Sequence, residues 1–264
     1  NIIWKYEGKY IAHHDLDLDE KGNIYLLTHK ELESHPQLEL TGPMLEDYIT
    51  VLSSQGREQK QISVLECFLN SDYSPLLDRM EREGDNLHAN TLEYLDGKYA
   101  DRIPFLKKGN LLIAIRQLSV IAVIDPVKEK VIWALTGLWR YAHHPTPIAN
   151  GNFLIFDNCG LTGRRSRVLE FNPLTQEIIW SYGDEKVHTF FSMYSGSCHR
   201  LPNGNTLIIQ SDRGRVFEVT PGKEMVWEYV NPFRPPPGEA GGSIYETIRI
   251  EPADYPFLES VPGK

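Results

Sequence analysis

Apolar residues along the chain fall into short runs, and a Gly-Asn pair precedes four of them. These pairs begin at Gly22, Gly109, Gly151 and Gly204, and the runs that follow are rich in Ile, Leu and Phe. Short apolar runs bounded by turn residues are typical of β-strands, because an amphipathic helix needs a longer pattern of a different period. The sequence therefore predicts a strand after each Gly-Asn turn.

A longer unit repeats together with this pair. Three of the runs are followed by a second apolar run, a turn that begins with Asp-Pro, Asn-Pro or Thr-Pro, and a third run that ends in Trp; these stretches are residues 119–133, 167–180 and 215–227. Proline presets the backbone angle of such a turn, and the short polar side chain before it can bond the backbone. Three or four strands per repeat are typical of a propeller blade.

We predict an all-β fold, a β-propeller with four recognisable blades at residues 11–66, 88–134, 143–182 and 195–230. Residues 1–6 resemble the outer strand of a further blade, and residues 243–250 read as one more strand. A closed ring of blades would pair the two terminal fragments so that no sheet edge is left open, and we therefore predict five or six blades. We expect residues 1–264 to form a single propeller domain that lacks N-terminal blade material of a longer parent.

The first blade is followed by an insertion. Residues 47–53 and 61–66 read as the last two strands of that blade, so the excess length before Gly109 is inserted chain. Within it, residues 74–84 predict a short helix at the rim: Ser74 can cap it, Pro75 suits the first helical position, and Leu76, Leu77 and Met80 supply an apolar stripe before Gly84.

Composition limits the classes of partner. A chain of 264 residues with 41% hydrophobic and 24% charged residues is ordinary for a globular protein with a real core. The net charge of -9 argues against nucleic-acid binding, which needs a basic face. It still permits an anionic small substrate, because local Arg and His residues can invert the field inside a cleft.

Targeting and redox signals are few. No apolar stretch is long enough to cross a membrane, and the start at Asn1 without a visible secretory signal is what a processed or trimmed chain shows. The three cysteines, Cys67, Cys159 and Cys198, form no CxxC pair, which argues against a structural zinc site.

Histidines stand at matching places before two Gly-Asn turns. His14 lies eight residues before Gly22, and His143 lies eight residues before Gly151. In a propeller the innermost strand of each blade lines the central channel, so imidazoles at the start of such strands can converge there. We expect His88, which opens the second blade, to join them.

Two more side chains complete a candidate site. Arg116 ends the apolar run after Gly109, and Asn90 follows His88. Three imidazoles, a guanidinium and an amide can all donate hydrogen bonds to a tetrahedral oxyanion, and one neutral imidazole can act as a nucleophile. Each residue also has a structural alternative. The histidines can be loop or capping residues, Arg116 can form an ion pair at the edge of a blade, and Asn90 can hydrogen-bond backbone groups at the start of a strand. Strand alternation points His13 and His144 the other way.

The sequence resembles the arylsulfate sulfotransferase (arylsulfotransferase) family of β-propellers over most of its length. The phrases that carry the resemblance are residues 13–15, 87–90, 115–116, 143 with 151–152 and 156–158, 200–208, and 226–232. Their order along the chain is more specific than any one of them.

The resemblance implies a sulfotransferase that moves a sulfo group from a phenolic sulfate ester to a phenol, through a sulfated histidine and without a nucleotide sulfate donor or cofactor. His143 matches the nucleophile of the family. His14, His88, Asn90 and Arg116 match positions that hold the sulfo group and polarise the leaving oxygen. His144 follows the nucleophile, and we assign it to substrate binding. The family also implies a periplasmic or secreted location.

Two other functions are open at this point. One is a metal-dependent propeller enzyme in which His14, His88 and His143 ligate a divalent metal. The other is a non-catalytic binding platform whose interface lies in residues 29–46 or 235–237. The platform predicts that the histidines do not converge.

Overall fold

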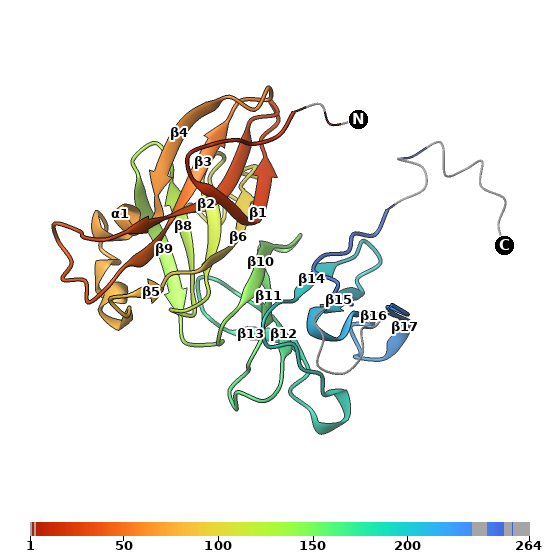
Figure 1. The fold of residues 1–264 in the computed structure, drawn as a ribbon. Coiled ribbons are helices and arrows are strands. Elements are labelled where there is room, and N and C mark those ends of the chain that lie inside the picture. Colours follow the sequence, from red (N-terminus) through yellow and green to blue (C-terminus); the bar gives the residue numbers. More distant parts are fainter. Residues whose placement is uncertain (1, 3, 234–241, 251–254, 256–264) are drawn as a thin grey trace. The chain divides into compact units, whose positions relative to one another are not determined.

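The structure is a computed structural model that describes residues 2, 4–233, 242–250 and 255 (Figure 1). The chain falls into two compact units, Asn1–Met193 and Tyr194–Lys264. The first unit contains three of the four antiparallel sheets formed by the described residues, and the second unit contains the fourth.

Each sheet has four strands that pair in the order of the sequence, and the first sheet has a fifth strand in addition. The first has β1 (Ile11–Leu18), β2 (Ile24–Leu32), β3 (Met44–Leu52) and β4 (Glu58–Ser63), with the short β5 (Gly84–Asp85) parallel to β3. The second has β6 (Ala89–Tyr94), β7 (Leu111–Ile115), β8 (Val120–Asp125) and β9 (Lys130–Thr136). The third has β10 (His143–Pro147), β11 (Phe153–Asp157), β12 (Arg167–Phe171) and β13 (Ile178–Tyr182). In the second unit the sheet has β14 (Ser197–Arg200), β15 (Thr206–Gln210), β16 (Arg215–Val219) and β17 (Met225–Val230). These are the blades of a β-propeller, so the predicted fold class and the four blades are confirmed.

The Gly-Asn pair has a local backbone reason. Gly109, Gly151 and Gly204 have φ of +87°, +86° and +86°, a left-handed conformation that costs glycine little. The asparagine that follows then anchors the turn: the amides of Asn152 and Asn205 donate to carboxylates of the third strand of their own blades, Glu170 and Glu218. The repeated phrase is therefore a structural device that closes the first hairpin of a blade.

The second blade is buried on both faces. Leu111 and Ile113 of β7 pack in one cluster with residues of the first blade, whereas Leu112 and Ala114 pack in another with residues of the third. Successive side chains of a strand point to opposite faces, so a strand covered on both sides needs a continuous apolar run. This explains why the run after Gly109 shows no alternation.

The helical insertion differs from the prediction. The α-helix α1 (Val64–Leu69) was missed; Ser63 caps it by accepting a 3.0 Å hydrogen bond from the backbone N–H of Glu66, which ends β4 at Ser63 rather than at residue 66. The predicted helix over 74–84 is the 3₁₀ helix η1 (Ser74–Arg79), which no side chain caps. Gly84 belongs to β5 instead.

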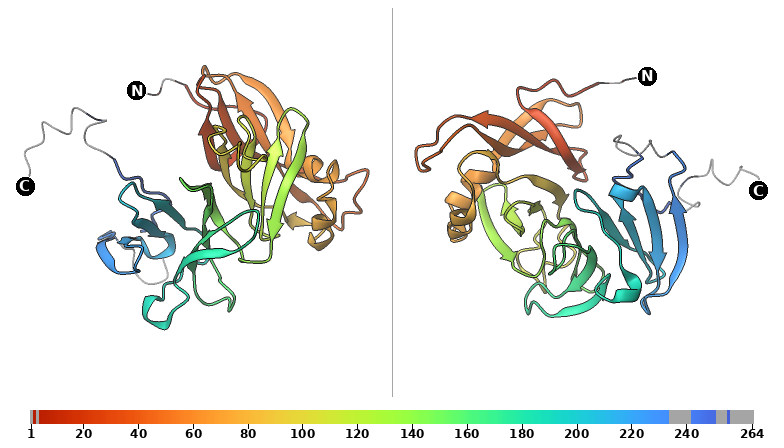
Figure 2. Two further views of the ribbon diagram at one scale, coloured as in Figure 1. Left: turned by 180° about the vertical axis from the view of Figure 1, so that it is seen from behind. Right: turned by 60° about the horizontal axis from the view of Figure 1, so that its bottom comes forward.

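The helices of the insertion lie beside the first two blades, where α1 contacts β3 and β9 (Figure 2). Two further 3₁₀ turns are η2 (Lys186–His188) and η3 (Ser211–Arg213). Within the described ranges, every helix falls short of the length and apolar character that a bilayer crossing demands.

The predicted terminal strands are wrong. Residues 4–8 and 242–250 contain no strand. Both segments are held by side-chain contacts in place of a backbone ladder: the ring of Trp4 lies against Gly56, and Arg249 makes a 2.9 Å ion pair with Glu218. The described residues therefore hold four blades without partial ones, and the extent of the whole propeller stays a prediction.

Carboxylates of β1 join the first and second blades. Oδ2 of Asp15 accepts a 2.9 Å hydrogen bond from the backbone N–H of Leu92, and Oδ2 of Asp17 accepts a 2.7 Å one from Tyr94. The two side chains thus take the place of a partner strand along β6. Because an ionised acceptor makes a strong hydrogen bond, this contact fixes β1 against β6.

We expect Asp17→Ala to destabilise the protein by about 1.5–3 kcal/mol, because it removes a hydrogen bond to a charged group and leaves the N–H of Tyr94 without its acceptor. Urea unfolding measures this change. The exposed Asp72 offers a matched control, since Asp72→Ala should change the free energy of unfolding by less than about 0.5 kcal/mol. Equal effects of the two substitutions would contradict the role given to Asp17.

Candidate active site

His143 is the first residue of β10, and its side chain is buried, with 6% of the residue exposed. Its Nδ1 lies 2.7 Å from Oδ1 of Asn158 and 3.2 Å from the carbonyl oxygen of Tyr141. Both partners are acceptors, so Nδ1 carries the proton and donates. The other ring nitrogen, Nε2, then holds a free electron pair.

The orientation of Asn158 decides this assignment. Its Nδ2 donates a 2.8 Å hydrogen bond to the carbonyl oxygen of Ser192, which turns Oδ1 toward His143. The hydroxyl of Ser166 in turn donates to the carbonyl oxygen of Asn158 at 2.6 Å. Asn158 is itself fully buried, so water does not compete for the hydrogen bonds of its amide.

The pKa of His143 is lowered to about 3, mainly by burial and to a smaller extent by the charges of Arg116 and His14. The hydrogen bonds to Asn158 and Tyr141 act in the opposite direction. The imidazole is therefore neutral at neutral and mildly acidic pH. A buried neutral imidazole with a fixed tautomer is a competent nucleophile.

Arg116 follows β7 directly and reaches toward His143 from the second blade. Its guanidinium lies 4.8 Å from the ring centroid of Tyr141, whose carbonyl oxygen accepts from His143. Its backbone N–H donates a 3.1 Å hydrogen bond to the carbonyl oxygen of His88. These contacts bring Arg116 next to Tyr141 and His88, and a role for its guanidinium in the site stays a prediction.

His14 and His88 meet edge to face, with ring centroids 4.7 Å apart. Both have left-handed backbone, with φ of +49° and +55°, which is uncommon outside glycine. His88 also contacts the carboxylate of Asp85 through Nδ1. His14 is exposed at the surface, yet partial desolvation of its ring and the neighbouring imidazoles of His88 and His13 lower its pKa to about 4, so this ring is neutral near pH 7.

Asn90 occupies the place in its blade that His14 and His143 occupy in theirs. Each of the three stands four residues before the last paired residue of its strand, which is Leu18, Tyr94 or Pro147. The Gly-Asn spacing hid this equivalence, because a loop inserted between β6 and β7 displaces Gly109 along the chain. His88 lies two residues earlier and reaches the site from the start of the blade.

The side chain of Asn90 links two blades. Its Nδ2 donates a 3.0 Å hydrogen bond to the carbonyl oxygen of Ala142, and its Oδ1 accepts from the hydroxyl of Thr91. The same hydroxyl accepts a 2.9 Å hydrogen bond from the backbone N–H of His144. The backbone-satisfying role left open for Asn90 is therefore present, while sulfo-group contacts of Asn90 and His144 stay predictions.

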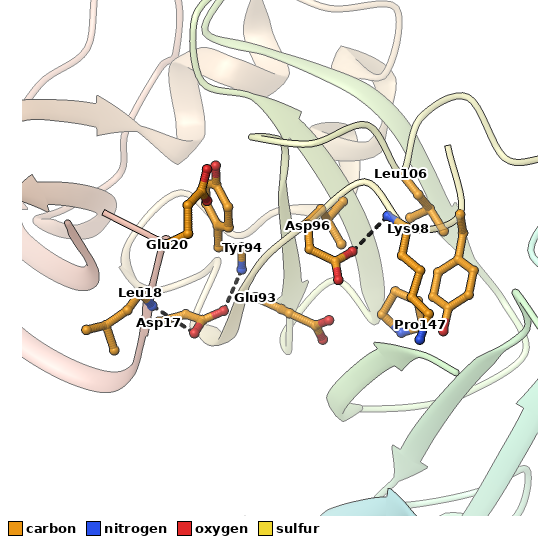
Figure 3. A pocket seen from close by; sticks show the side chains of 11 residues that line it. Asp17, Leu18, Glu20, Glu93, Tyr94, Asp96, Lys98, Leu106 and Pro147 are labelled. Carbon is orange, nitrogen blue, oxygen red and sulfur yellow. Dashed lines mark hydrogen bonds between the residues drawn. The ribbon is translucent and has the colours of Figure 1, made fainter. Parts of the chain in front are cut away.

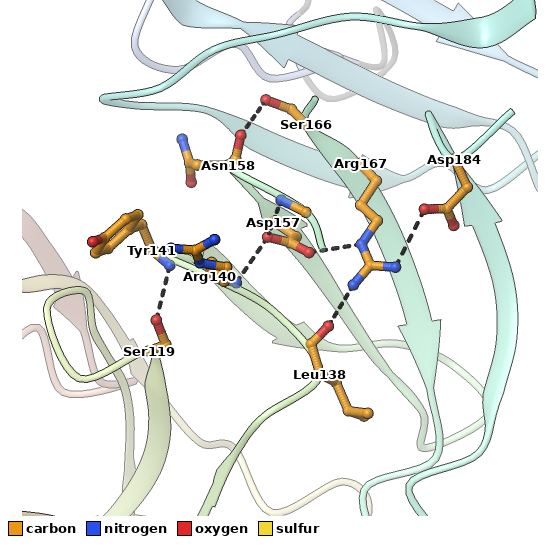
Figure 4. Close-up of polar contacts among 10 residues, drawn as sticks. Ser119, Leu138, Arg140, Tyr141, Asp157, Asn158, Ser166, Arg167 and Asp184 are labelled. Atoms are coloured by element: carbon orange, nitrogen blue, oxygen red, sulfur yellow. Dashed lines mark hydrogen bonds and ion pairs between the residues drawn. The ribbon is translucent and has the colours of Figure 1, made fainter. Parts of the chain in front are cut away.

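Sequence reasoning missed the residue that shapes the loop before His143. The carboxylate of Asp157 is fully buried; Oδ1 accepts from the backbone N–H of Arg140 at 2.9 Å, and Oδ2 pairs with Nε of Arg167 at 2.7 Å (Figure 4). Arg167 also donates to the carbonyl oxygen of Leu138 and contacts Asp184 at 3.2 Å. The sequence did contain a signal for this role, because Asp157 is the one polar residue at the end of an otherwise apolar strand.

Two pockets lie near the ends of these strands. One of about 340 Å³ is lined by Arg79, Arg140, Trp139 and Tyr141, among others, and shares Tyr141 with the surroundings of His143. The other, of about 390 Å³, lies where β1, β6 and β10 end and is acidic (Figure 3). Burial raises the pKa of its Glu93 to about 8, with nearby Asp17 and Asp96 adding to the effect. The lining of the first pocket contains two arginines and no carboxylate, whereas that of the second contains four carboxylates and one lysine.

Two of the three functional hypotheses lose support. Among the described residues, the groups of three possible metal ligands whose atoms lie within 4.8 Å of one another do not include His14, His88 and His143 together. The binding platform predicted histidines that stay apart, yet His14 and His88 are in contact. Residues 235–237, the other part of that hypothesis, lie outside the described residues.

Comparison with known proteins identifies the family of the chain. A profile of the arylsulfotransferase (ASST) family matches residues 5–232. The chain belongs to the arylsulfotransferase family. No curated protein matches it.

Solved structures with a related arrangement of strands include three propellers of low sequence identity. The Dos1 propeller is 10% identical, with 81% of this chain and 47% of that chain covered and a TM-score of 0.49. Streptogramin B lyase is 12% identical, with 85% of this chain and 58% of that chain covered and a TM-score of 0.48. Virginiamycin B lyase from Staphylococcus aureus is 9% identical, with 84% of this chain and 71% of that chain covered and a TM-score of 0.44. The chain spans about half the length of the first two.

We expect the free energy of unfolding to fall as the pH is lowered from about 6.5 toward 3. In this window His143 binds a proton in the unfolded chain, at its ordinary pKa of 6.5, but stays neutral in the folded one, whose pKa is about 3. The unfolded state then holds more protons, so stability rises with pH by about 1.4 kcal/mol per unit for this one group.

Urea unfolding at several pH values from about 4 to 7 measures this slope. The variant His143→Gln lacks the titrating group and should show a shallower dependence than the wild type. Identical slopes for the two proteins would show that His143 is not a buried neutral imidazole.

Proposed function

We propose that this arylsulfotransferase moves a sulfo group from an aryl sulfate ester to a phenolic acceptor, with His143 as the nucleophile and no nucleotide sulfate donor. The observation that carries the proposal is the 2.7 Å hydrogen bond from Nδ1 of His143 to Asn158, which leaves Nε2 with a free electron pair at every pH above about 3. A periplasmic or secreted location stays a prediction of the family resemblance.

In the first step Nε2 of His143 attacks the sulfur of the donor. The S–O bond to the aryl group breaks, its electron pair leaves with the phenolate, and an N–S bond forms. The imidazole then carries a positive charge on the ring, and its Nδ1–H faces two acceptors, the Asn158 amide oxygen and the Tyr141 carbonyl. These acceptors stabilise the charged ring, because hydrogen bonds to an ionised group are stronger than neutral ones.

In the second step the oxygen of the acceptor phenol attacks the sulfur and the N–S bond breaks. Its electron pair returns to Nε2, and the phenolic proton passes to the phenolate released in the first step or to water. The first step builds negative charge on the leaving phenolate oxygen, and we assign Arg116, His14 and His88 as the donors that stabilise it. Fixed donors aimed at developing charge give the largest single contribution to many enzymatic rate enhancements.

We expect His143→Gln to abolish transfer from 4-nitrophenyl sulfate to phenol, because glutamine is close in shape but cannot form the sulfated intermediate. Release of 4-nitrophenolate measures the reaction, and mass spectrometry of the quenched wild-type protein should find one SO₃ group on His143. The half-buried His188 offers a matched control, and His188→Gln should keep the wild-type rate. Transfer that survives in His143→Gln would overturn the assignment of the nucleophile.

We expect Arg116→Gln to lower kcat by about 10²–10³-fold, the effect of removing one donor that acts on the transition state. Arg116→Lys should recover part of this loss, since it keeps the charge but not the planar fork of the guanidinium. Steady-state kinetics with the same donor measures both variants. The exposed Arg57 supplies the control: if Arg57→Gln lowers kcat as much, the effect is not specific to the site.

A further inference from the structure

A second group of chemically active side chains lies next to the candidate active site, within the first blade. His13 is on β1, His29 on β2 and Asp47 on β3, which are neighbouring strands. His29 and Asp47 are paired directly across β2 and β3. An irregular stretch of β1 between Ala12 and Leu16 turns His13 toward them.

The ligand atoms of these three residues lie within 4.8 Å of one another. Nε2 of His13 is 3.3 Å from Oδ1 of Asp47, and the rings of His13 and His29 have centroids 4.8 Å apart. A tetrahedral ion with ligands at about 2.0–2.1 Å separates neighbouring ligand atoms by about 3.3 Å. The spacing of His13 and Asp47 therefore suits two ligands of one ion.

The hydrogen bonds of the cluster leave the required atoms available. Nε2 of His13 is buried and has no hydrogen-bond partner among the described residues, although its ring points at a carboxylate. Asp47 is 2% exposed and uses Oδ2 to accept from the backbone N–H of Ala89 at 2.8 Å, which leaves Oδ1 facing His13. With the proton of His13 on Nδ1, Nε2 of His13 and Oδ1 of Asp47 are two acceptors that face each other at 3.3 Å, and a cation between them would satisfy both.

We propose that His13, His29 and Asp47 bind one divalent transition-metal ion, through Nε2 of His13 and Oδ1 of Asp47, with Zn²⁺ as the best fit. Two imidazoles and one carboxylate are a ligand set that suits zinc and other first-row metals, whereas Mg²⁺ and Ca²⁺ prefer sets of oxygen atoms only. Three protein ligands leave the fourth position to water.

The metal would set the protonation of the active site, an extension that rests on the proposed function. A metal on Nε2 leaves His13 with its proton on Nδ1, which is 2.8 Å from Nδ1 of His14. His13 must then donate, and His14 must accept at Nδ1 and keep its own proton on Nε2. Neighbours of a metal ligand are commonly oriented in this way. His14 would thereby be fixed as a donor toward an anionic substrate.

The test is metal titration of the full chain after dialysis against a chelator. We expect one equivalent of Zn²⁺ by calorimetry, and one equivalent of Co²⁺ with the intense visible absorption of a four-coordinate site. His29→Ala should weaken binding at least 10-fold, while His188→Ala should not change it. Ca²⁺ and Mg²⁺ should give no saturable binding.

Two outcomes would overturn the proposal: a wild-type chain that takes up no stoichiometric metal, or His29→Ala binding as tightly as the wild type with an unchanged circular dichroism spectrum. If His29→Ala fails to fold, His29→Gln removes the imidazole with less change of volume and answers the same question. Ring ¹⁵N shifts report the tautomer of His14 with and without Zn²⁺, and an unchanged tautomer would refute the link to the active site. None of these readouts depends on sulfo transfer, so failure of the proposed function would leave the metal site to be judged alone.

Discussion

Burial of the second blade on both faces is the constraint on which the rest of the first unit depends. Alternate residues of β7 pack against the first and the third blade, so the three sheets are locked at fixed positions by their side chains. The starts of β6 and β10 and the bend in β1 are then held near one another. Close packing of this kind resists small displacements, which is what a site assembled from separate blades requires.

The same packing holds backbone that is unfavourable by itself. His14, His88 and His144 all have φ near +50°. Each residue in a sparsely populated backbone region costs about 1–3 kcal/mol, and it persists only where the surroundings fix it. Each lies beside a register shift in the inner strand of its blade. Such bulges re-aim side chains, and here they are found where the imidazoles gather.

Electrostatics of the site differ from those of the whole chain. The protein carries a net charge of -9, yet the guanidiniums of Arg116 and Arg140 both lie within 6 Å of the ring centroid of Tyr141, whose carbonyl oxygen faces His143. The buried carboxylate of Asp157 is neutralised by Arg167 and turned to backbone N–H groups. Cations and imidazoles therefore lie at this end of the strands, where we propose that the anionic substrate binds, and the acidic pocket of Figure 3 lies at the other end.

The sequence alone determined the repeat and the four blades, because glycine turns and apolar runs are local signals, and the family phrases supplied the candidate site residues. Tertiary structure decided the rest. The equivalence of Asn90 with His14 and His143 became visible only through strand register, since a loop insertion breaks the spacing on which sequence comparison relied. The tautomer of His143 depends on Asn158, which is fixed in turn by Ser192, and the pair of His29 with Asp47 exists only across a sheet. Hydrogen bonds and pairings between residues far apart in the chain are set by packing, and no local pattern encodes them.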